Sequence, residues 1–464
     1  MLPRDWCAGP TSCTIVLTHY KTRTHPTRRC EKRRGEAARV RRGDVAETAG
    51  TNWAGNYTYT ASEVRHPSSV DDVRAAVREA AASGARVHAI GTRHCFNDIA
   101  DTPGVHLAMT SLTPRFELDE QARTVTVSAG ERYGDIALRL DAAGYALPNL
   151  ASLPHISVAG AIATATHGSG DRNVNLAAVV AGLELVDGTG ELVTLRRGDA
   201  DFDGAVVGIG ALGIITAVTL DVVPSFEVEQ TVYDGLDWEA VLEHYDAITS
   251  SAYSVSMFTD WVDGVQQVWL KRRADEQGEA PVTFFGSPKS TVKRHPLPGV
   301  DASACTDQFG VPGPWYDRLP HFKLEFTPSN GEEIQSEYLV PRERAADAIR
   351  ALLPLAEQIA PVLQVTELRT VAADELWLSS AYQRDVTGIH FTWKRDQQAV
   401  EAVLPAIEAA LFPLGARPHW GKVFVDVEGV VPSLYPRFDD FRALASRFDP
   451  KGVFRNAYLD RLLG

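Results

Sequence analysis

The octapeptide GTRHCFND, residues 91–98, follows the apolar run RVHAIG (86–91) and continues neither a helical nor a strand period. The apolar run is typical of a short buried strand, so the octapeptide begins where that strand ends. Gly91 has no Cβ atom, and the backbone N–H groups beside it can therefore approach a ligand closely. Such a loop can hold a pyrophosphate through amide hydrogen bonds alone, although most glycine-rich turns between elements are only turns.

A second glycine-rich stretch, ISVAGAIATATHGSGDRN (156–173), offers the same opportunity. Neither stretch matches the GxGxxG fingerprint of the dinucleotide-binding fold or the GxxxxGK(S/T) phosphate loop. A nucleotide held by these two loops would therefore be bound by a different fold.

His94, inside the first loop, admits three interpretations: a hydrogen-bonded core histidine, a metal ligand or a nucleophile. No Cys or His stands near it at the spacing of metal ligands, which disfavours the second. As a nucleophile, an imidazole beside the dimethylbenzene edge of a flavin can add to the 8α-methyl position and attach the cofactor covalently. The residues alone leave the choice open.

Helical and strand patterns alternate from residue 62 onward. The stretch SVDDVRAAVREAAASG (69–84) predicts a helix, because it places Val70, Val73 and Val77 on one face between a Ser69 cap and Gly84. A second helix is predicted at 132–144. Strands are predicted at 86–91, 123–130 and 213–223, with a hairpin at 183–195 that turns at 187–190. Mixed α and β structure with hairpins predicts an α+β domain over residues 49–224.

A second, sheet-based domain is expected over residues 225–415, with the Pro/Gly-rich stretch 281–330 as loop and connection. Residues 416–464 are expected to return to the first domain. The predicted strands are 253–261, 266–273, 363–371 and 387–393, and the predicted helices are 341–359 and 396–412.

The first 48 residues differ in composition from the rest. Residues 1–42 contain eleven Lys or Arg against three acidic residues, a net charge of +8, whereas the whole chain carries −14 and the rest therefore −22. The basic string RRCEKRR could be a nucleic-acid patch, and a solvated tail or an over-extended reading frame that truly begins near Val45 are the alternatives. The acidic body argues against nucleic acid and for a small-molecule partner.

The five cysteines give no disulfide framework, since Cys7, Cys13 and Cys30 lie in the basic segment and only Cys95 and Cys305 in the body. Without CxxC motifs a metal site is not expected, and a reducing cytoplasm fits best. No stretch is apolar enough for a membrane span or a secretory signal. We therefore expect a cytoplasmic protein without a membrane partner, and a monomer.

Long strings distributed over residues 51–464 resemble the flavoprotein oxidases of the vanillyl-alcohol oxidase type. Within that group the chain is similar to the alditol oxidases, which are related to the sugar-1,4-lactone oxidases. The strings are TNWAGN, GTRHCFND, LPNLASLPHISVAGAIATATHGSG, YSVSMFTDW, CTDQFGVPGPW, TELRTVAAD, HFTW, RPHWGK and FRNAYL.

This resemblance implies an FAD-linked oxidase fold with a substrate (cap) domain, and FAD attached through His94. The implied reaction converts the terminal primary alcohol of an alditol such as xylitol or sorbitol to the aldose, and oxygen to hydrogen peroxide. An aldono-1,4-lactone oxidase or dehydrogenase is the alternative, and a flavin- or sugar-binding protein without turnover is a third. Such enzymes commonly have serine after the attachment histidine, whereas this chain has Cys95.

The resemblance also implies roles for individual residues. Catalytic roles fall on Glu367, Arg369 and Lys422, and the substrate site consists of Ser152, Glu367, Arg369, Thr392 and Lys422. The cofactor site consists of Ala89, Ile90, Gly91, Thr92, Arg93, His94, Cys95, Ser152, Ser157, Gly160, Thr164, Ala165, Thr166, His167, Ile215, Arg369 and His419.

Glu367 and Arg369 are two apart in a predicted strand, so both side chains project from the same face and can meet one ligand. The alternative is a cross-strand ion pair on a solvated sheet face. HWGK (419–422) is likewise either part of the site or an ordinary turn with a packed Trp420.

Overall fold

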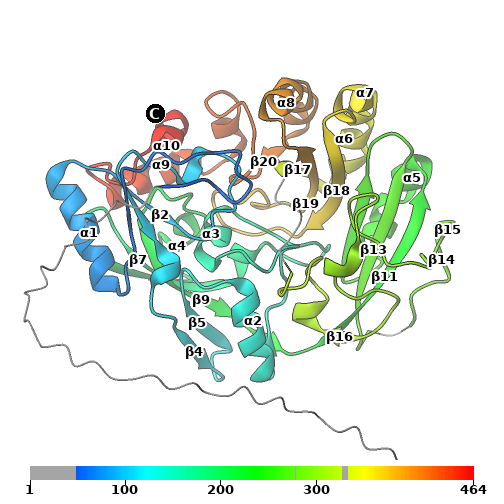
Figure 1. Ribbon diagram of the computed structural model, residues 1–464, viewed down its shortest axis with the longest axis horizontal. Coiled ribbons are helices and arrows are strands. Elements are labelled where there is room, and N and C mark those ends of the chain that lie inside the picture. Colours follow the sequence, from blue (N-terminus) through cyan, green and yellow to red (C-terminus); the bar gives the residue numbers. More distant parts are fainter. Residues whose placement is uncertain (1–48, 277, 327–332) are drawn as a thin grey trace, which may run out of the picture. The chain divides into compact units, whose positions relative to one another are not determined.

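In the computed structural model, which describes residues 49–276, 278–326 and 333–464, the loop 91–98 leaves the end of strand β2 (Figure 1). That strand, Val87–Ile90, is predicted correctly and lies at the edge of a three-stranded parallel sheet of order β1-β3-β2. β1 is Glu63–Arg65 and β3 is Val105–Ala108. Since the strands are parallel, their carboxyl ends lie at one edge of the sheet, and the loop begins there.

Helix α1 (Val70–Ser83), which was predicted at 69–84, connects β1 to β2. The Ser69 hydroxyl accepts from the Asp72 N–H, and the Asp72 carboxylate accepts from the Ser69 N–H, which forms a capping box worth about 1 kcal/mol. Gly84 ends the helix with φ of 71°, a left-handed conformation that favours glycine. Buried Val73 and Val77 pack in one cluster with side chains of β2 and β3, so α1 covers this small sheet.

A five-stranded antiparallel sheet of order β4-β5-β9-β7-β8 follows, and it includes the predicted 183–195 hairpin. Its strands are β4 (Phe116–Asp119), β5 (Thr124–Ser128), β7 (Val180–Val186), β8 (Leu192–Arg196) and β9 (Ile214–Asp221). The helices of this region are α2 (Tyr133–Ala142), α3 (Val158–Ala163) and α4 (Phe202–Ala205). Two-residue strands β6 (Tyr145–Ala146) and β10 (Val223–Pro224) pair with each other.

An eight-stranded antiparallel sheet occupies the second half, in the order β16-β11-β13-β12-β18-β19-β17-β20. Its long strands are β11 (Glu227–Leu236), β12 (Ser254–Thr259), β13 (Val265–Arg273), β17 (Glu333–Pro341), β18 (Leu363–Val371) and β19 (Val386–Lys394). Short strands β16 (Gly313–Pro314) and β20 (Arg417–Pro418) lie at its two edges.

The central strands of this sheet are buried on both faces, because different layers cover the two sides. Helices α5 (Trp238–Thr249), α6 (Ala345–Leu352) and α8 (Gln397–Leu411) pack on one face (Figure 1). On the other face the register aligns Phe258, Glu367, His390 and Glu337 in one row across β12, β18, β19 and β17. Three of these four side chains are ionisable, so the centre of this face is polar although it is buried.

The predicted helix at 341–359 is wrong in its extent, because Pro354 interrupts it. α6 ends at Leu352, a single 3₁₀ turn covers Leu353–Leu355, and α7 (Ala356–Ile359) follows. Proline has no N–H to donate to the preceding turn and its ring crowds that turn. Within the predicted connection 281–330, the two-residue strands β14 (Thr283–Phe284) and β15 (Ser287–Pro288) form a small hairpin.

The C-terminal segment contacts the elements at the start of the described chain. It contains α9 (Phe438–Phe448) and α10 (Ala457–Leu463). The Asn456 side chain donates to the carbonyls of Ile99 and Asp101, and the Val87 N–H donates to the Val453 carbonyl. Residues 46–464 form one compact unit, and the domain boundaries at 224/225 and 415/416 stay predictions.

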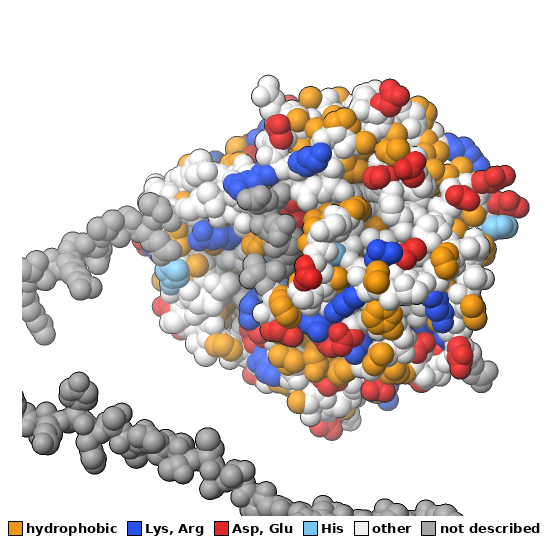
Figure 2. All heavy atoms as spheres, turned by 45° about the vertical axis from the view of Figure 1, so that its right-hand side comes forward, with side chains coloured by type: hydrophobic (Ala, Val, Ile, Leu, Met, Phe, Trp, Pro, Cys, Tyr) orange, Lys and Arg blue, Asp and Glu red, His pale blue; other side chains and the backbone are white. Residues whose placement is uncertain are grey.

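Acidic, basic and apolar side chains are interspersed on the molecular face of Figure 2. Among the described residues, no helix has the length and apolar character to cross a membrane. The predictions made for the basic segment 1–48, including those for Cys7, Cys13 and Cys30, lie outside the described residues.

Candidate active site

A single cavity brings together the loop 91–98, the second glycine-rich stretch and the polar face of the eight-stranded sheet. Every residue predicted for the site from the sequence lines this cavity except Ala165. Ala165 is buried beside it and has φ of 53°, so it bends the chain directly after α3. Ala165 itself does not line the cavity, whereas its neighbours Thr164 and Thr166 do, and its place in the cofactor site stays a prediction.

The loop after β2 is suited to holding an anionic group. Within the described chain, the N–H groups of residues 92–95 donate to no protein acceptor. Arg93 has φ of 62°, a conformation that costs a non-glycine residue free energy and is concentrated at ligand sites. A Cβ atom on Gly91 would meet the Ser157 hydroxyl at 2.2 Å, so only glycine lets the two loops come this close.

His94 lies in the cavity wall with one ring nitrogen unused. Its Nδ1 is 2.9 Å from the Thr92 hydroxyl, and its ring stacks on Trp53 with centroids 5.2 Å apart. Its Nε2 is buried and has no hydrogen-bond partner among the described residues. Burial lowers the pKa of His94 to about 4, so the ring is neutral at neutral pH. His94 is therefore hydrogen-bonded at one ring nitrogen only, its Nε2 has no partner among the described residues, and its role stays a prediction.

Glu367 and Arg369 project from β18 toward the cavity and are buried, with 4% and 5% exposure. The Glu367 carboxylate is 2.8 Å from His321 Nε2 and 3.6 Å from Arg369 Nε. Burial opposes ionisation of Glu367, but the Arg369 guanidinium and His321 hold its pKa below the usual value. The prediction that both share one face is confirmed, and the alternative of a solvated ion pair is wrong.

Glu337 on β17 joins the two predicted cations, and sequence analysis missed it. One carboxylate oxygen accepts from Arg369 Nη2 at 2.7 Å and the other from Lys422 Nζ at 2.6 Å. Burial would raise the pKa of Glu337, but Lys422 and Arg369 hold it well below the ordinary value. A Cβ atom at Gly388 on β19 would lie 3.0 Å from the same carboxylate, so a glycine there leaves room for the contact. Arg369 and Lys422 are thereby held at fixed positions by one buried anion.

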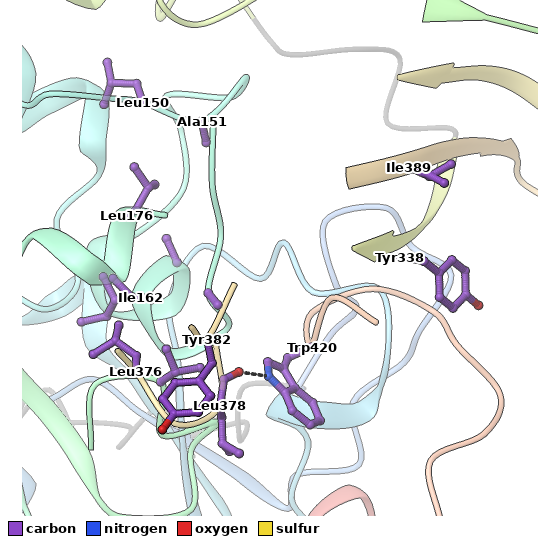
Figure 3. Close-up of a cluster of buried hydrophobic side chains, with 14 of the residues drawn as sticks. Leu150, Ala151, Ile162, Leu176, Tyr338, Leu376, Leu378, Tyr382, Ile389 and Trp420 are labelled. Atoms are coloured by element: carbon purple, nitrogen blue, oxygen red, sulfur yellow. Dashed lines mark hydrogen bonds between the residues drawn. The ribbon is translucent and has the colours of Figure 1, made fainter. Parts of the chain in front are cut away.

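Lys422 belongs to the turn HWGK, which Trp420 fixes in place. The fully buried indole donates its N–H to the Leu378 carbonyl at 2.7 Å, the dashed line in Figure 3, and stacks on Tyr435. His419 in the same turn accepts from the Gly421 N–H at Nδ1, so its Nε2 carries the proton and faces Thr166 at 3.5 Å. The turn is thus both a packed turn and part of the site.

Ionisable side chains that were not predicted also lie next to Glu367: His321 and His390 line the cavity, and Lys271 contacts His321 from behind it. His390 lies between Glu367 and Glu337 in the row across the sheet and has a buried Nε2 without a partner among the described residues. Burial, together with the charge of Lys422, keeps its pKa well below the ordinary value, so the ring is neutral. The string HFTW contained this histidine, but only Thr392 was taken from it.

Two family models match the chain. A model described as the FAD binding domain matches residues 61–196, and one described as D-arabinono-1,4-lactone oxidase matches residues 328–462. The first includes both glycine-rich loops, and the second includes Glu337, Glu367, Arg369, His390 and Lys422.

Known proteins are similar over most of the chain. An alditol oxidase of Streptomyces sp. is 49% identical over 90% of this chain and 99% of its own length. An L-gulono-1,4-lactone dehydrogenase of Mycobacterium tuberculosis is 30% identical over 89% of this chain and 99% of its own length. A solved cholesterol oxidase from B. sterolicum superposes with a TM-score of 0.72 at 15% identity, over 90% of this chain and 97% of its own, which confirms the predicted α+β oxidase fold.

Proposed function

The chain belongs to the family of FAD-dependent alditol oxidases and their sugar-lactone relatives, and on this premise we propose that it oxidises the terminal primary alcohol of an alditol such as xylitol or sorbitol. The products are the aldose and hydrogen peroxide, with oxygen as the electron acceptor. Its cofactor is FAD, which accepts a hydride from carbon when bound and passes the electrons on. One observation carries the proposal: Arg369 and Lys422 are fixed on the two oxygens of one buried carboxylate, beside Glu367.

The free N–H groups of residues 92–95 and the close approach of Gly91 to Ser157 fit the pyrophosphate of FAD. The buried Nε2 of His94 fits covalent attachment of the flavin. Cys95 after it has nearly the size of serine but forms weaker hydrogen bonds. We propose His94 as the attachment point.

Arg369 and Lys422 stabilise negative charge that develops on the substrate oxygen as the alcohol loses its proton. Both cations are buried, so water screens their charge little. Glu337 opposes the effect of burial on the pKa of Lys422, which keeps this lysine a hydrogen-bond donor.

The hydroxyl proton needs an acceptor, and His390 supplies one. Its ring is neutral and its Nε2 has no partner among the described residues, whereas Lys422 already donates to Glu337. Burial, Lys422 and Arg369 lower the pKa of His390, whereas Glu337 and Glu367 oppose them, so a proton taken up at Nε2 would be released again readily.

Substrate recognition falls to Glu367, Ser152 and Thr392. Glu367 can accept hydrogen bonds from neighbouring hydroxyls of a polyol, and the two hydroxyl side chains contribute further polar contacts. An analogue that lacks a hydroxyl would leave a buried carboxylate unpaired, and the site therefore selects compounds dense in hydroxyl groups. Free Cys95 and Cys305 support the further proposal of a cytoplasmic protein, and we propose that it acts as a monomer.

A substrate panel tests the function. We expect oxygen consumption and peroxide formation with xylitol and sorbitol at a kcat/KM well above that for aldono-1,4-lactones. Without air, xylitol should bleach the yellow flavin. A preference for lactones would move the protein to the lactone oxidases or dehydrogenases, and a yellow protein that no alditol or lactone bleaches would be a binding protein without turnover.

A further inference from the structure

We infer that Lys271 and His321 form a proton-ordered pair that positions Glu367, so that the carboxylate offers one defined oxygen to the polyol. The inference rests on the proposed function and assigns positioning roles to two side chains outside the reacting centre. Lys271 Nζ and both ring nitrogens of His321 each have defined hydrogen-bond partners, and these contacts support the inference.

Lys271 on β13 is almost completely buried, with 1% exposure. Its Nζ contacts three acceptors, which are the carbonyls of Leu319 and Pro320 and the Nδ1 of His321. An ammonium group has three N–H donors, and three acceptors surround it here. Only the protonated form of Lys271 satisfies all three acceptors.

The ring of His321 packs against two aromatic side chains. It meets Trp269 and Phe258 edge to face, with centroids 5.1 Å and 5.6 Å away. Its backbone N–H donates to the Ser152 carbonyl, and its own carbonyl accepts from the Thr306 N–H. Burial lowers the pKa of His321 to about 4, so the ring is neutral. Because Nδ1 accepts from Lys271, the single proton of the ring lies on Nε2.

That proton points at Glu367. His321 Nε2 lies 2.8 Å from Glu367 Oε1, which makes Oε1 an occupied acceptor. Oε2 lies 3.6 Å from Arg369 Nε and 3.9 Å from His390 Nδ1, longer than a hydrogen bond. The carboxylate therefore presents Oε2 as the available acceptor in the cavity, and the pair fixes which oxygen this is.

The pair also makes substrate affinity dependent on pH. Burial lowers the pKa of Lys271 to about 7, and the charged or titratable groups around it are His321, Glu367, Arg369 and Cys305. Below that pKa the ammonium holds the Nε2–H form of His321. Above it, Lys271 can pass one proton to Nδ1 of His321 while the ring releases its Nε2 proton, so that the pair as a whole has lost one proton. Nδ1–H then donates to the lone pair of the neutral amine, and the hydrogen bond from Nε2 to Glu367 is lost.

Kinetics of the FAD-loaded enzyme test this inference. For the unchanged enzyme, KM for xylitol should be constant below about pH 6.5 and rise about tenfold or more by pH 9, with kcat less affected, because Glu367 binds ground state and transition state alike. Lys271→Met should have the high KM at every pH, and His321→Asn should resemble it. Lys293→Met is the matched control, because Lys293 donates to the Cys305 carbonyl of the same region and does not contact His321. A flat KM for the unchanged enzyme, or a Lys271→Met variant with ordinary KM, would overturn the inference.

A second measurement does not need turnover. In holoenzyme labelled with ¹⁵N-histidine, the His321 signal, assigned by its loss in His321→Asn, should show the neutral ring with the proton on Nε2 at pH 6. The proton should move between pH 7 and 8. A His321 ring protonated on Nδ1 at pH 6 would refute the pair. If no alditol is oxidised at all, the proposed function fails, and the NMR signal still decides the inference.

Discussion

At the scale of single residues, His94 allows a direct test of the cofactor linkage. After acid denaturation, FAD should stay with the unchanged polypeptide and fluoresce with it in a denaturing gel, whereas His94→Ala should release it, because Nε2 is the unused nitrogen that faces the cofactor site. His66→Ala, at an exposed histidine, is the control. Release of FAD from the unchanged protein would contradict the linkage. It would also suggest that Cys95, in place of serine, prevents attachment.

Arg369 and Lys422 should act on the chemical step. Arg369→Ala and Lys422→Met should each slow flavin reduction by xylitol about 100- to 1000-fold in anaerobic rapid mixing, because each removes fixed charge from the developing oxyanion. Glu367→Gln should instead weaken binding more than it slows reduction. Lys394→Met is a matched control, because Lys394 lies on an exposed end of β19 and donates to the Pro361 carbonyl. If both cation variants changed only the half-saturating concentration, these residues would position the substrate and no more.

At the scale of elements, strand β17 sets the protonation of Lys422 through Glu337. Glu337 raises the pKa of Lys422 against the effect of burial, so Glu337→Gln should lower that pKa further. The alkaline fall in the rate of flavin reduction should then move to lower pH by about one to three units. Gln335→Glu, at the next cavity-lining position of β17, keeps Glu337 and is the comparison. An unchanged pH profile in Glu337→Gln would show that Lys422 does not depend on this carboxylate.

Some helices and strands could be predicted from the sequence, whereas strand β17 could not. Alternation and capping predicted α1, the 183–195 hairpin, β18 and β19, because each carries its signal within a few residues. β17 was missed, although it carries Glu337. Its residues 333–341 mix charged, polar and apolar side chains that are nearly all buried, so no period of two separates a wet face from a dry one.

The same reason explains which site residues were found. His94, Glu367, Arg369 and Lys422 lie in long strings that resemble known oxidases, and those strings predicted them. Lys271 and His321 come from a strand and a connecting segment with no local signal, and only their meeting in space makes them part of the site. A buried hydrogen bond between two distant segments leaves no periodic pattern in the sequence.

At the scale of the whole molecule, a chain beginning at Ala46 should bind FAD and turn over xylitol as the full chain does. Residues 46–464 form one compact unit, and the match to the Streptomyces alditol oxidase covers 99% of that protein with 90% of this chain. Equal melting temperature, flavin content and kcat/KM in the two chains would be the expected result. A shortened chain that loses FAD or melts several degrees lower would show that the basic segment contributes to the fold.

The two thiols of the described chain, Cys95 and Cys305, are possible targets of oxidation by the peroxide that the proposed reaction forms. Peroxide oxidises the thiolate form of cysteine, and susceptibility falls as the thiol pKa rises. Burial raises the pKa of both Cys95 and Cys305 to about 12, although Cys95 stands in the wall of the cavity where peroxide would form. At neutral pH almost none of either residue is thiolate, so under the proposed reaction, which forms peroxide at each turnover, both thiols are in the form that peroxide oxidises least.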